Sequence, residues 1–393
     1  MSASNSPRSR TLPLGSPILA MAKHAANLRS QGKDIIDLTL GEPDLPPPAH
    51  VVTAARESAA KPLGYSPANG LMELRAAIRR STVRDFGLEY ADNEVAVGCG
   101  AKQIIFNSFM ATLDPGDEVV IPAPYWASYP DIATMLGGIA VIVPCEQSNG
   151  FKLSATALSS AITEKTRWLV LNSPGNPTGS IYSEHELEGL ARVLRQHQHV
   201  MVLCDDIYAH IHYGKAPPPT FAAVAPDLRD RLLIVNGVSK SYSMTGWRVG
   251  WGLGPEALIS RICAIQSQNC TQTSTLSQFA AISALDGPQE ILAQRRAMYF
   301  DRCVDALEML ETSVHLGLAI PDGGFYLFVK LPACLDDEMT AKALMSFGVA
   351  TVFGSAFGAP GYLRLSFATD SEALREGCKR LVNGIARLME ERR

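Results

Sequence analysis

Short apolar runs recur between residues 94 and 254 and are separated by segments with a helical period of apolar positions. The runs are EVAVGCG, DEVVIPAP, IAVIVPC, RWLVLNSP, HVMVLCDD, RLLIVNGVS and WRVGWGLG. Continuous apolar runs of this length are typical of strands that are buried on both faces. Their alternation with helices predicts an α/β fold with a mostly parallel, doubly wound sheet.

The pattern differs at both ends of this region. Residues 1–16 are rich in Ser, Pro and Arg, which predicts a flexible N-terminal arm, and residues 18–31 predict a helix before the short strand DIIDLTL. After residue 288 the pattern indicates a long helix, the strands GGFYLFVKL and GYLRLSFAT, and a closing helix. We therefore expect a large domain at 51–287 and a smaller α+β domain formed by 17–50 and 288–393.

Composition narrows the class of protein. The 393 residues suffice for two domains, and a formal net charge of -4 gives no reason to expect nucleic acid or an anionic membrane as a partner. No apolar stretch is long enough to span a bilayer, and prolines and a glycine interrupt the one segment that resembles a signal peptide. Eight cysteines occur singly, without a CxxC pair, which indicates a reducing cytoplasm.

A lysine and an arginine follow one of the predicted strands. Residues 231–236 form an apolar run, so Lys240 lies just beyond the carboxyl end of a strand, where open α/β folds bind ligands. A desolvated lysine loses its proton readily and forms Schiff bases, including one with the aldehyde of pyridoxal phosphate. Arg248 has the planar guanidinium that suits a phosphate group. This pair predicts a lysine that holds a cofactor and an arginine that binds its phosphate.

Glycines precede a predicted helix after the strand EVAVGCG. Backbone N–H groups at Gly100, Ala101 and Lys102 would point out of the helix start and favour an anion. A Rossmann fingerprint is the competing interpretation, but Gln103 stands where that motif needs Gly or Ala. No Walker loop occurs in the chain. We therefore predict a phosphate site here and disfavour a nicotinamide oxidoreductase.

Two carboxylates end the strand HVMVLCDD. Asp205 at the end of a buried strand needs a partner, and a protonated pyridine nitrogen would serve. Asp206 is the alternative for that role. A metal is the rival interpretation, with His210 and His212 on a predicted strand nearby, but no further ligand cluster supports it, so no metal is expected.

Three further positions could contribute to the site. The turn NSPGNPTG would place the amides of Asn172 and Asn176 at the sheet edge, or it is simply a rigid turn. The indole of Trp126 could stack on a flat ring or fill the core. Arg364 lies inside the apolar GYLRLSFAT, where an unpaired guanidinium is costly, so we expect it to meet a carboxylate.

These motifs together resemble the class I/II aminotransferases, the fold type I enzymes that use pyridoxal phosphate, and most closely the bacterial aspartate-aminotransferase-like subgroup. The resemblance runs from about Ser16 to the last helix. It rests on GEPD, YSP, GAKQ, PYW, NSPGNPTG, DDIY, SKSYSMTGWR and RLS, which occur in the family's order.

The resemblance implies roles for these residues. Lys240 would form the Schiff base with the cofactor and, once released, move the proton between the substrate Cα and the cofactor C4′. Asp205 would pair with the pyridinium nitrogen, and Trp126 would stack on the ring. Asn176 and Tyr208 would hydrogen-bond the phenolic oxygen of the cofactor.

The same resemblance assigns the remaining contacts. The phosphate would be bound by the backbone at Gly100, Ala101 and Lys102 and by Ser239, Arg248 and, from a second subunit, Tyr65. A homodimer with shared active sites follows. Arg364, assisted by Asn176 and the Gly41 backbone, would bind the substrate α-carboxylate.

Substrate choice is less determined. Lys102 and Ser16 match positions that contact acidic side chains in this subgroup, whereas Ile18, Gly237 and Phe353 depart from its pattern. The resemblance favours an acidic donor such as aspartate and an acceptor such as 2-oxoglutarate. A C–S β-lyase or other α,β-elimination enzyme is the alternative on the same fold. A non-enzymatic regulator would need an attached DNA-binding module, which we do not expect.

Overall fold

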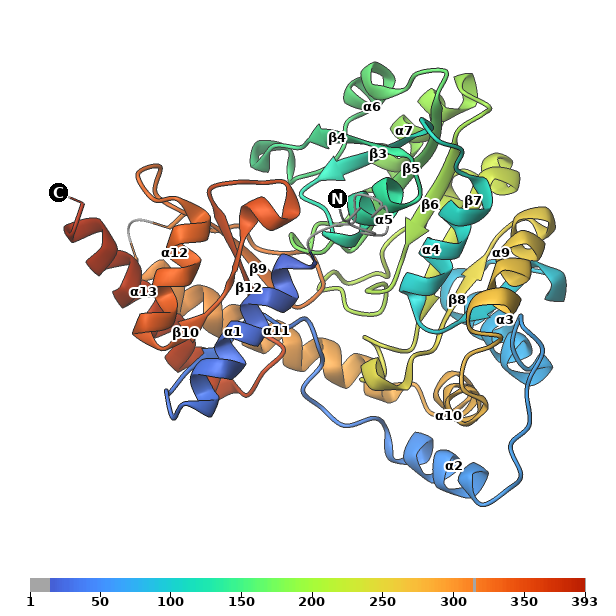
Figure 1. Cartoon of the computed structure of the whole chain (residues 1–393), viewed down its shortest axis with the longest axis horizontal. Helices are drawn as coiled ribbons and strands as arrows, with labels where there is room; N and C mark the ends of the chain where they lie inside the picture. The colour runs from blue at the N-terminus through green and yellow to red at the C-terminus, as the bar shows by residue number, and fades with distance from the viewer. Residues whose placement is uncertain (1–14, 314–315, 393) are drawn as a thin grey trace, which may run out of the picture.

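The computed structural model describes residues 15–313 and 316–392. These residues form a larger body around a central sheet and a smaller body that contains both the first helix and the last one (Figure 1). The long helix α11 (Glu290–Glu311) runs between the two bodies.

The central sheet has seven strands in the order β2-β8-β7-β6-β5-β3-β4. Only β8 runs antiparallel to its neighbours, so the prediction of a mostly parallel α/β sheet is confirmed. The strands are β2 (Val95–Gly98), β3 (Glu118–Ala123), β4 (Ile139–Pro144), β5 (Thr166–Asn172), β6 (Met201–Asp205), β7 (Leu232–Gly237) and β8 (Gly250–Leu253). Each falls within one of the apolar runs, except that β5 begins one residue before its run, at Thr166.

Hydrophobic cores lie on both faces of this sheet because successive strand residues point in opposite directions. In β5, Leu169 and Leu171 belong to one core, and Trp168 and Val170 to the other. The helices around the sheet are α2 (Ala49–Ala59), α3 (Met72–Phe86), α4 (Ala101–Thr112), α5 (Ser128–Met135), α6 (Ala155–Ala161), α7 (Glu184–Gln196), α8 (Phe221–Val224), α9 (Glu256–Asn269) and α10 (Thr275–Asp286).

Several helices begin where a short polar side chain binds a free N–H group of the first turn. Ser183 accepts from the N–H of Glu186, whose carboxylate in turn accepts from the N–H of Ser183, which is a capping box. Ser154 and Ser274 cap α6 and α10 in the simpler way. These residues fix the helix starts that the hydrophobic pattern alone leaves open.

The smaller body combines residues from both ends of the chain. Strand β1 (Ile36–Asp37) pairs in parallel with β10 (Val349–Ala350), so the N-terminal segment joins the C-terminal part. A three-stranded antiparallel sheet has the order β11-β12-β9, with β9 (Tyr326–Lys330), β11 (Val352–Phe353) and β12 (Tyr362–Ser366). Its helices are α1 (Pro17–Ser30), α11, α12 (Asp337–Leu344) and α13 (Ser371–Glu390).

Short 3₁₀ turns connect these elements: η1 (Asp92–Glu94), η2 (Gln147–Asn149), η3 (Pro226–Arg231), η4 (Thr245–Trp247), η5 (Met345–Phe347) and η6 (Gly354–Phe357). One local prediction was wrong. His210 and His212 do not lie on a strand. The N–H groups of Ala209 and Ile211 bond back to Asp206 and Tyr208 and form turns, and His212 makes only an isolated β-bridge with Gly323. The domain limits at residues 50 and 287 remain predictions, and the arm at 1–16 lies almost wholly outside the described residues.

Candidate active site

A cavity of about 520 Å³ opens at the carboxyl ends of β5, β6 and β7, where ligands bind in open α/β sheets. Its size suits a cofactor or small substrate. Most of the predicted site residues line it: Gly41, Ala101, Lys102, Trp126, Asn176, Asp205, Tyr208, Ser239, Lys240, Arg248 and Arg364. We call it the active-site cavity.

Lys240 lies three residues beyond the end of β7 and reaches the wall of this cavity. Its Nζ donates to the carbonyl oxygen of Gly41 at 2.6 Å. Burial lowers the pKa of Lys240 to about 8, Arg364 and Arg248 act in the same direction, and Glu42 and Asp205 oppose them. A lysine with this pKa has a free amine fraction near neutral pH, as a Schiff-base lysine requires.

Asp205 ends β6 with its carboxylate in the active-site cavity. The hydroxyl of Tyr129 donates to Asp205 Oδ2 at 2.6 Å, and the N–H of Ile207 donates to Oδ1 at 3.3 Å. Burial raises the pKa of Asp205 to about 6, although both hydrogen bonds and the charge of Lys240 oppose this. A bound cation would complete the partners of this carboxylate.

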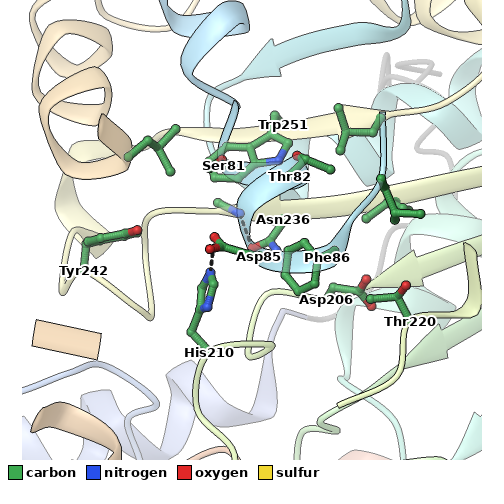
Figure 2. Close-up of a pocket in the computed structure, with 15 residues that line it drawn as sticks. Ser81, Thr82, Asp85, Phe86, Asp206, His210, Thr220, Asn236, Tyr242 and Trp251 are labelled. Atoms are coloured by element: carbon green, nitrogen blue, oxygen red, sulfur yellow. Dashed lines mark hydrogen bonds and ion pairs between the residues drawn. The ribbon is translucent and has the colours of Figure 1, made fainter. Parts of the chain in front are cut away.

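Asp206 lines a different cavity. This rear cavity of about 20 Å³ has Asp206, Thr220, Asn236, Tyr242 and Trp251 in its wall (Figure 2). His210 Nε2 lies 3.4 Å from Asp85 Oδ2 at the same place, and burial lowers the pKa of His210 to about 4. The space suffices for about one water molecule, not for a cofactor ring. The structure therefore brings Asp205, and not Asp206, to the lysine.

The start of α4 and Arg248 meet at the wall of the active-site cavity. The first N–H groups of a helix have no partner within the helix and favour an anion, and the first two residues of α4, Ala101 and Lys102, line this cavity. Arg248 donates to the carbonyls of Thr245 and Cys99 at 2.9 and 3.2 Å. Its φ of 56° is rare for a residue other than glycine, and such conformations cluster at functional sites.

Glycines make this approach possible. A Cβ on Gly100, whose φ is 84°, would overlap the Arg248 guanidinium, and a Cβ on Gly250 would overlap the N of Ala101. The donors and the room of this cradle fit a phosphate group, and Asp205 fits a protonated ring nitrogen. The described residues thus fit pyridoxal phosphate at both of its ends.

Arg364 in β12 is 1% exposed, and its guanidinium lies 4.4 Å from the ring of Tyr326. It donates to Asn176 Oδ1 at 3.0 Å and to the carbonyl of Thr39, whereas its Nε has no partner. Burial lowers the pKa of Arg364. No carboxylate among the described residues forms an ion pair with it, so the carboxylate that the sequence led us to expect is not found within the described parts of the chain.

Lys102 Nζ lies 4.7 Å from the centre of the Trp126 ring, at the edge of the same cavity. Partial burial lowers the pKa of Lys102, the charge of Arg248 adds to this, and Asp131 opposes it. Lys102, Trp126 and Arg248 thus line the same cavity, and the geometry leaves open whether Lys102 serves a phosphate or a substrate side chain.

Three predicted residues do not line the cavity. Gly100 forms the cradle behind Arg248, Ser16 lies at the N-cap position of α1, and Tyr65 is 90% exposed. Two residues of the site were missed. Tyr129 follows the PYW motif by three positions, which could have revealed it. Tyr326 is in an apolar strand, and only the fold places its hydroxyl 2.8 Å from that of Tyr208.

In the described parts of the chain, no group of three or more His, Cys, Asp or Glu side chains could hold a metal ion. None of the helices between residues 15 and 392 that the structure describes is long and apolar enough to cross a membrane.

Known proteins are similar to this chain over nearly its whole length. The chain is 43% identical over 380 residues to a probable aspartate/prephenate aminotransferase of Rickettsia felis, covering 93% of each. It is 41% identical over 379 residues to the aspartate/prephenate aminotransferase of Cereibacter sphaeroides, covering 93% of this chain and 95% of that one.

Solved structures agree. The aspartate aminotransferase of Rhizobium meliloti superposes with a TM-score of 0.93 at 41% identity, covering 97% of this chain and 99% of that one. The aspartate aminotransferase of Thermus thermophilus with maleate gives 0.91 at 36% identity, covering 96% and 100%. The sequence model of the family "Aminotransferase class I and II" matches residues 33–381. The chain belongs to this family and is a fold type I aminotransferase that uses pyridoxal phosphate to move amino groups between amino acids and 2-oxo acids.

Proposed function

We propose that this enzyme takes its amino group from aspartate and passes it to 2-oxoglutarate. The observation that carries this proposal is that the cavity contains, besides Lys240 and Arg248, two further cationic side chains, Arg364 and Lys102. A dicarboxylic amino acid could engage both cations at once. The relatives named above for aspartate support the same donor. The alternative of a β-lyase finds no support among them.

The residues would divide the work as follows. When bound, pyridoxal phosphate supplies an aldehyde that condenses with amines and a ring that accepts electrons. Arg248, Ser239 and the start of α4 would bind its phosphate. Asp205, supported by Tyr129, would hold the proton on the ring nitrogen. Trp126, Asn176 and Tyr208 would contact the ring and its phenolic oxygen.

Two residues would act on the substrate directly. Arg364 would bind the α-carboxylate with the donors that Asn176 and Thr39 leave free, including its unpartnered Nε. This orients the Cα–H bond, and the free amine of Lys240 takes that proton. With a pKa lowered to about 8, Lys240 is a sufficiently strong base and still releases the proton again.

A second acceptor is favoured by the cavity wall. Ile18, Leu19 and Leu40 give one side of the cavity an apolar surface that a small dicarboxylate does not need. Relatives at 41–43% identity carry prephenate in their names. We propose prephenate as a further amino acceptor.

We also propose a homodimer with shared active sites in the cytoplasm. Tyr65 is 90% exposed in the single chain, so its side chain is free to contact a second subunit. A Tyr65 that reached the phosphate of a second subunit would explain this exposure. The eight cysteines are all free, as expected in a reducing compartment.

A panel of donors tests the proposed reaction. The purified holoenzyme is assayed with 2-oxoglutarate and aspartate, glutamate, alanine or phenylalanine, and then with prephenate and aspartate. We expect the highest kcat/KM with aspartate. A higher value with alanine or phenylalanine would contradict the acidic donor. Borohydride reduction followed by peptide mapping should fix the cofactor to Lys240, and labelling of another lysine would refute its role.

A further inference from the structure

Two arginines of α11 lie seven residues apart, which places them on the same face of the helix two turns apart. Arg295 and Arg302 are 4% and 7% exposed, so both guanidinium groups are inside the protein. Neither residue lines the active-site cavity. Both nevertheless bind the segment that contains Gly41.

Arg302 binds this segment through a bidentate ion pair. Its two terminal nitrogens lie 2.8 Å from the two carboxylate oxygens of Asp44, the last residue of the GEPD motif. This geometry fixes direction as well as distance, because both N–H bonds must point at the same carboxylate. Asp44 is thereby tied to α11 three residues after Gly41.

Arg295 connects the same segment to the backbone that follows Lys240. One terminal nitrogen donates to the carbonyl of Ser241 at 2.8 Å, and the other donates to the carbonyl of Pro46 at 2.7 Å. Ser241 is the residue after Lys240. A single guanidinium thus fixes the backbone beside Lys240 relative to the backbone beyond Asp44.

These contacts close a ring. Lys240 donates to the Gly41 carbonyl at 2.6 Å, the chain runs from Gly41 to Pro46, and Arg295 returns from Pro46 to Ser241. Gly41 is confined on its other side as well, since a Cβ there would overlap the hydroxyl of Tyr326. The position of the Gly41 carbonyl therefore depends in part on Arg295 and Arg302, which lie outside the active-site cavity.

We propose that Arg295 and Arg302 are positioning residues, which hold the Gly41 carbonyl where it receives the free amine of Lys240 and so aim that amine at the substrate proton. The proposal rests on the role of Lys240 given above. Arg295 has no carboxylate partner in the described parts of the chain, and burial lowers its pKa. Since an apolar side chain would fill this volume without desolvating a charge, a stabilising role alone does not account for a guanidinium here.

The test compares holoenzymes of Arg295→Met, Arg295→Lys and Asp44→Asn with the wild type. Arg375→Met is the matched control, because Arg375 also binds α11, through Asp305 at 2.7 Å, but on an exposed surface. Steady-state kinetics with aspartate, the kinetic isotope effect with deuterium at Cα, and Tm are measured for each variant.

We expect kcat of Arg295→Met to fall about ten- to a hundredfold, because small displacements of a catalytic group are this costly. KM for aspartate should change less than about threefold, since Arg364 is untouched, and the isotope effect should rise as proton removal becomes limiting. Arg295→Lys should recover part of the loss, and Arg375→Met should match the wild type.

An unchanged kcat, or a rise in KM alone, would overturn the proposal. A lower kcat accompanied by a lower Tm, without a larger isotope effect, would also overturn it, because that result would indicate a purely structural role. If Arg295→Met does not fold, Asp44→Asn decides by the same criteria, because it retains the side-chain shape at a partly exposed position. Borohydride labelling of Lys240 in each variant separates failure of this proposal from failure of the proposed function.

Discussion

Two neighbouring aspartates at the end of β6 are buried to a similar degree but lie in different surroundings. Asp205 and Asp206 are 4% and 8% exposed. Asp205 receives hydrogen bonds from Tyr129 and Ile207 and opens on the active-site cavity. The Asp206 side chain opens on the rear cavity and has no hydrogen bond or ion pair to any described residue.

Asp205 and Asp206 show that burial does not by itself make a catalytic carboxylate. Burial raises the pKa of both aspartates, and for Asp206 the charge of Asp205 acts in the same direction. Only Asp205 has donors and a nearby lysine that stabilise its ionised form. Asp205 can therefore be the anion opposite a bound cation, whereas for Asp206 both burial and the charge of Asp205 favour the neutral form.

The largest effect is expected on the active-site side, at Lys240. Lys240→Ala removes the amine that moves the Cα proton and should lower kcat about a thousandfold or more. The cofactor should still bind through Arg248 and the start of α4, although without a covalent bond. Kinetics and cofactor stoichiometry measure both effects, with the exposed Lys379→Ala of α13 as control. Near-normal turnover of Lys240→Ala would refute its role.

A second test replaces each of the two aspartates in turn with asparagine. Asp205→Asn removes a charge-assisted contact of about 1.5–3 kcal/mol, which corresponds to a loss of roughly ten- to a hundredfold in kcat. Asp206→Asn should leave kcat within about threefold of the wild type, because Asp206 does not line the active-site cavity and a carboxyl and an amide are similar in shape. A larger loss at position 206 than at 205 would reverse the comparison.

The sequence predicted the active-site side far better than the rear side. Asp205 and Lys240 lie at or just after the ends of apolar runs, and parallel chain direction brings these strand ends together in one cavity. Arg364 lies within an apolar run, where a guanidinium needs a partner, and it lines the same cavity. Tyr129 and Tyr326 could not be predicted in the same way, since their hydroxyl partners are 76 and 118 residues distant in sequence. Only the tertiary packing of the helices and strands creates those contacts.

The rear cavity shows the same limit. The sequence left Asp205 and Asp206 as alternatives, because adjacent strand residues point to opposite faces and the hydrophobic pattern does not say which face has room. It also placed His210 on a strand, although backbone turns put this residue beside Asp85. The arginines of α11 gave no signal in sequence, since Arg295 and Arg302 resemble the polar positions of any long helix.

A smaller effect within the active-site cavity concerns Lys102. If its ammonium binds the distal carboxylate, Lys102→Ala should lower kcat/KM for aspartate and glutamate about tenfold or somewhat more and spare alanine and phenylalanine. The measurement is the ratio of kcat/KM between acidic and neutral donors. An equal loss with all four donors, together with weaker retention of the cofactor, would instead place Lys102 at the phosphate beside Arg248.

The smallest effect is the one that isolates the rear cavity, because it concerns stability and not turnover. Since the folded pKa of Asp206 is raised above its ordinary value of 3.8, the native state keeps a proton that the unfolded chain loses as the pH rises. The stability that the neutral carboxyl contributes is fully present below about pH 4 and is lost as the pH rises through the folded pKa.

Asparagine has no such proton, so near pH 5 the Tm of Asp206→Asn should be equal to or below that of the wild type. Toward pH 8 the Tm of Asp206→Asn should exceed that of the wild type by about 1–3 °C. Thermal unfolding of the holoenzyme at both pH values measures this, and the exposed Asp301→Asn of α11 should show the same difference from the wild type at each. If Asp206→Asn also behaves identically at both pH values, Asp206 is ionised in the native protein, and the contrast between the two aspartates lies in position alone.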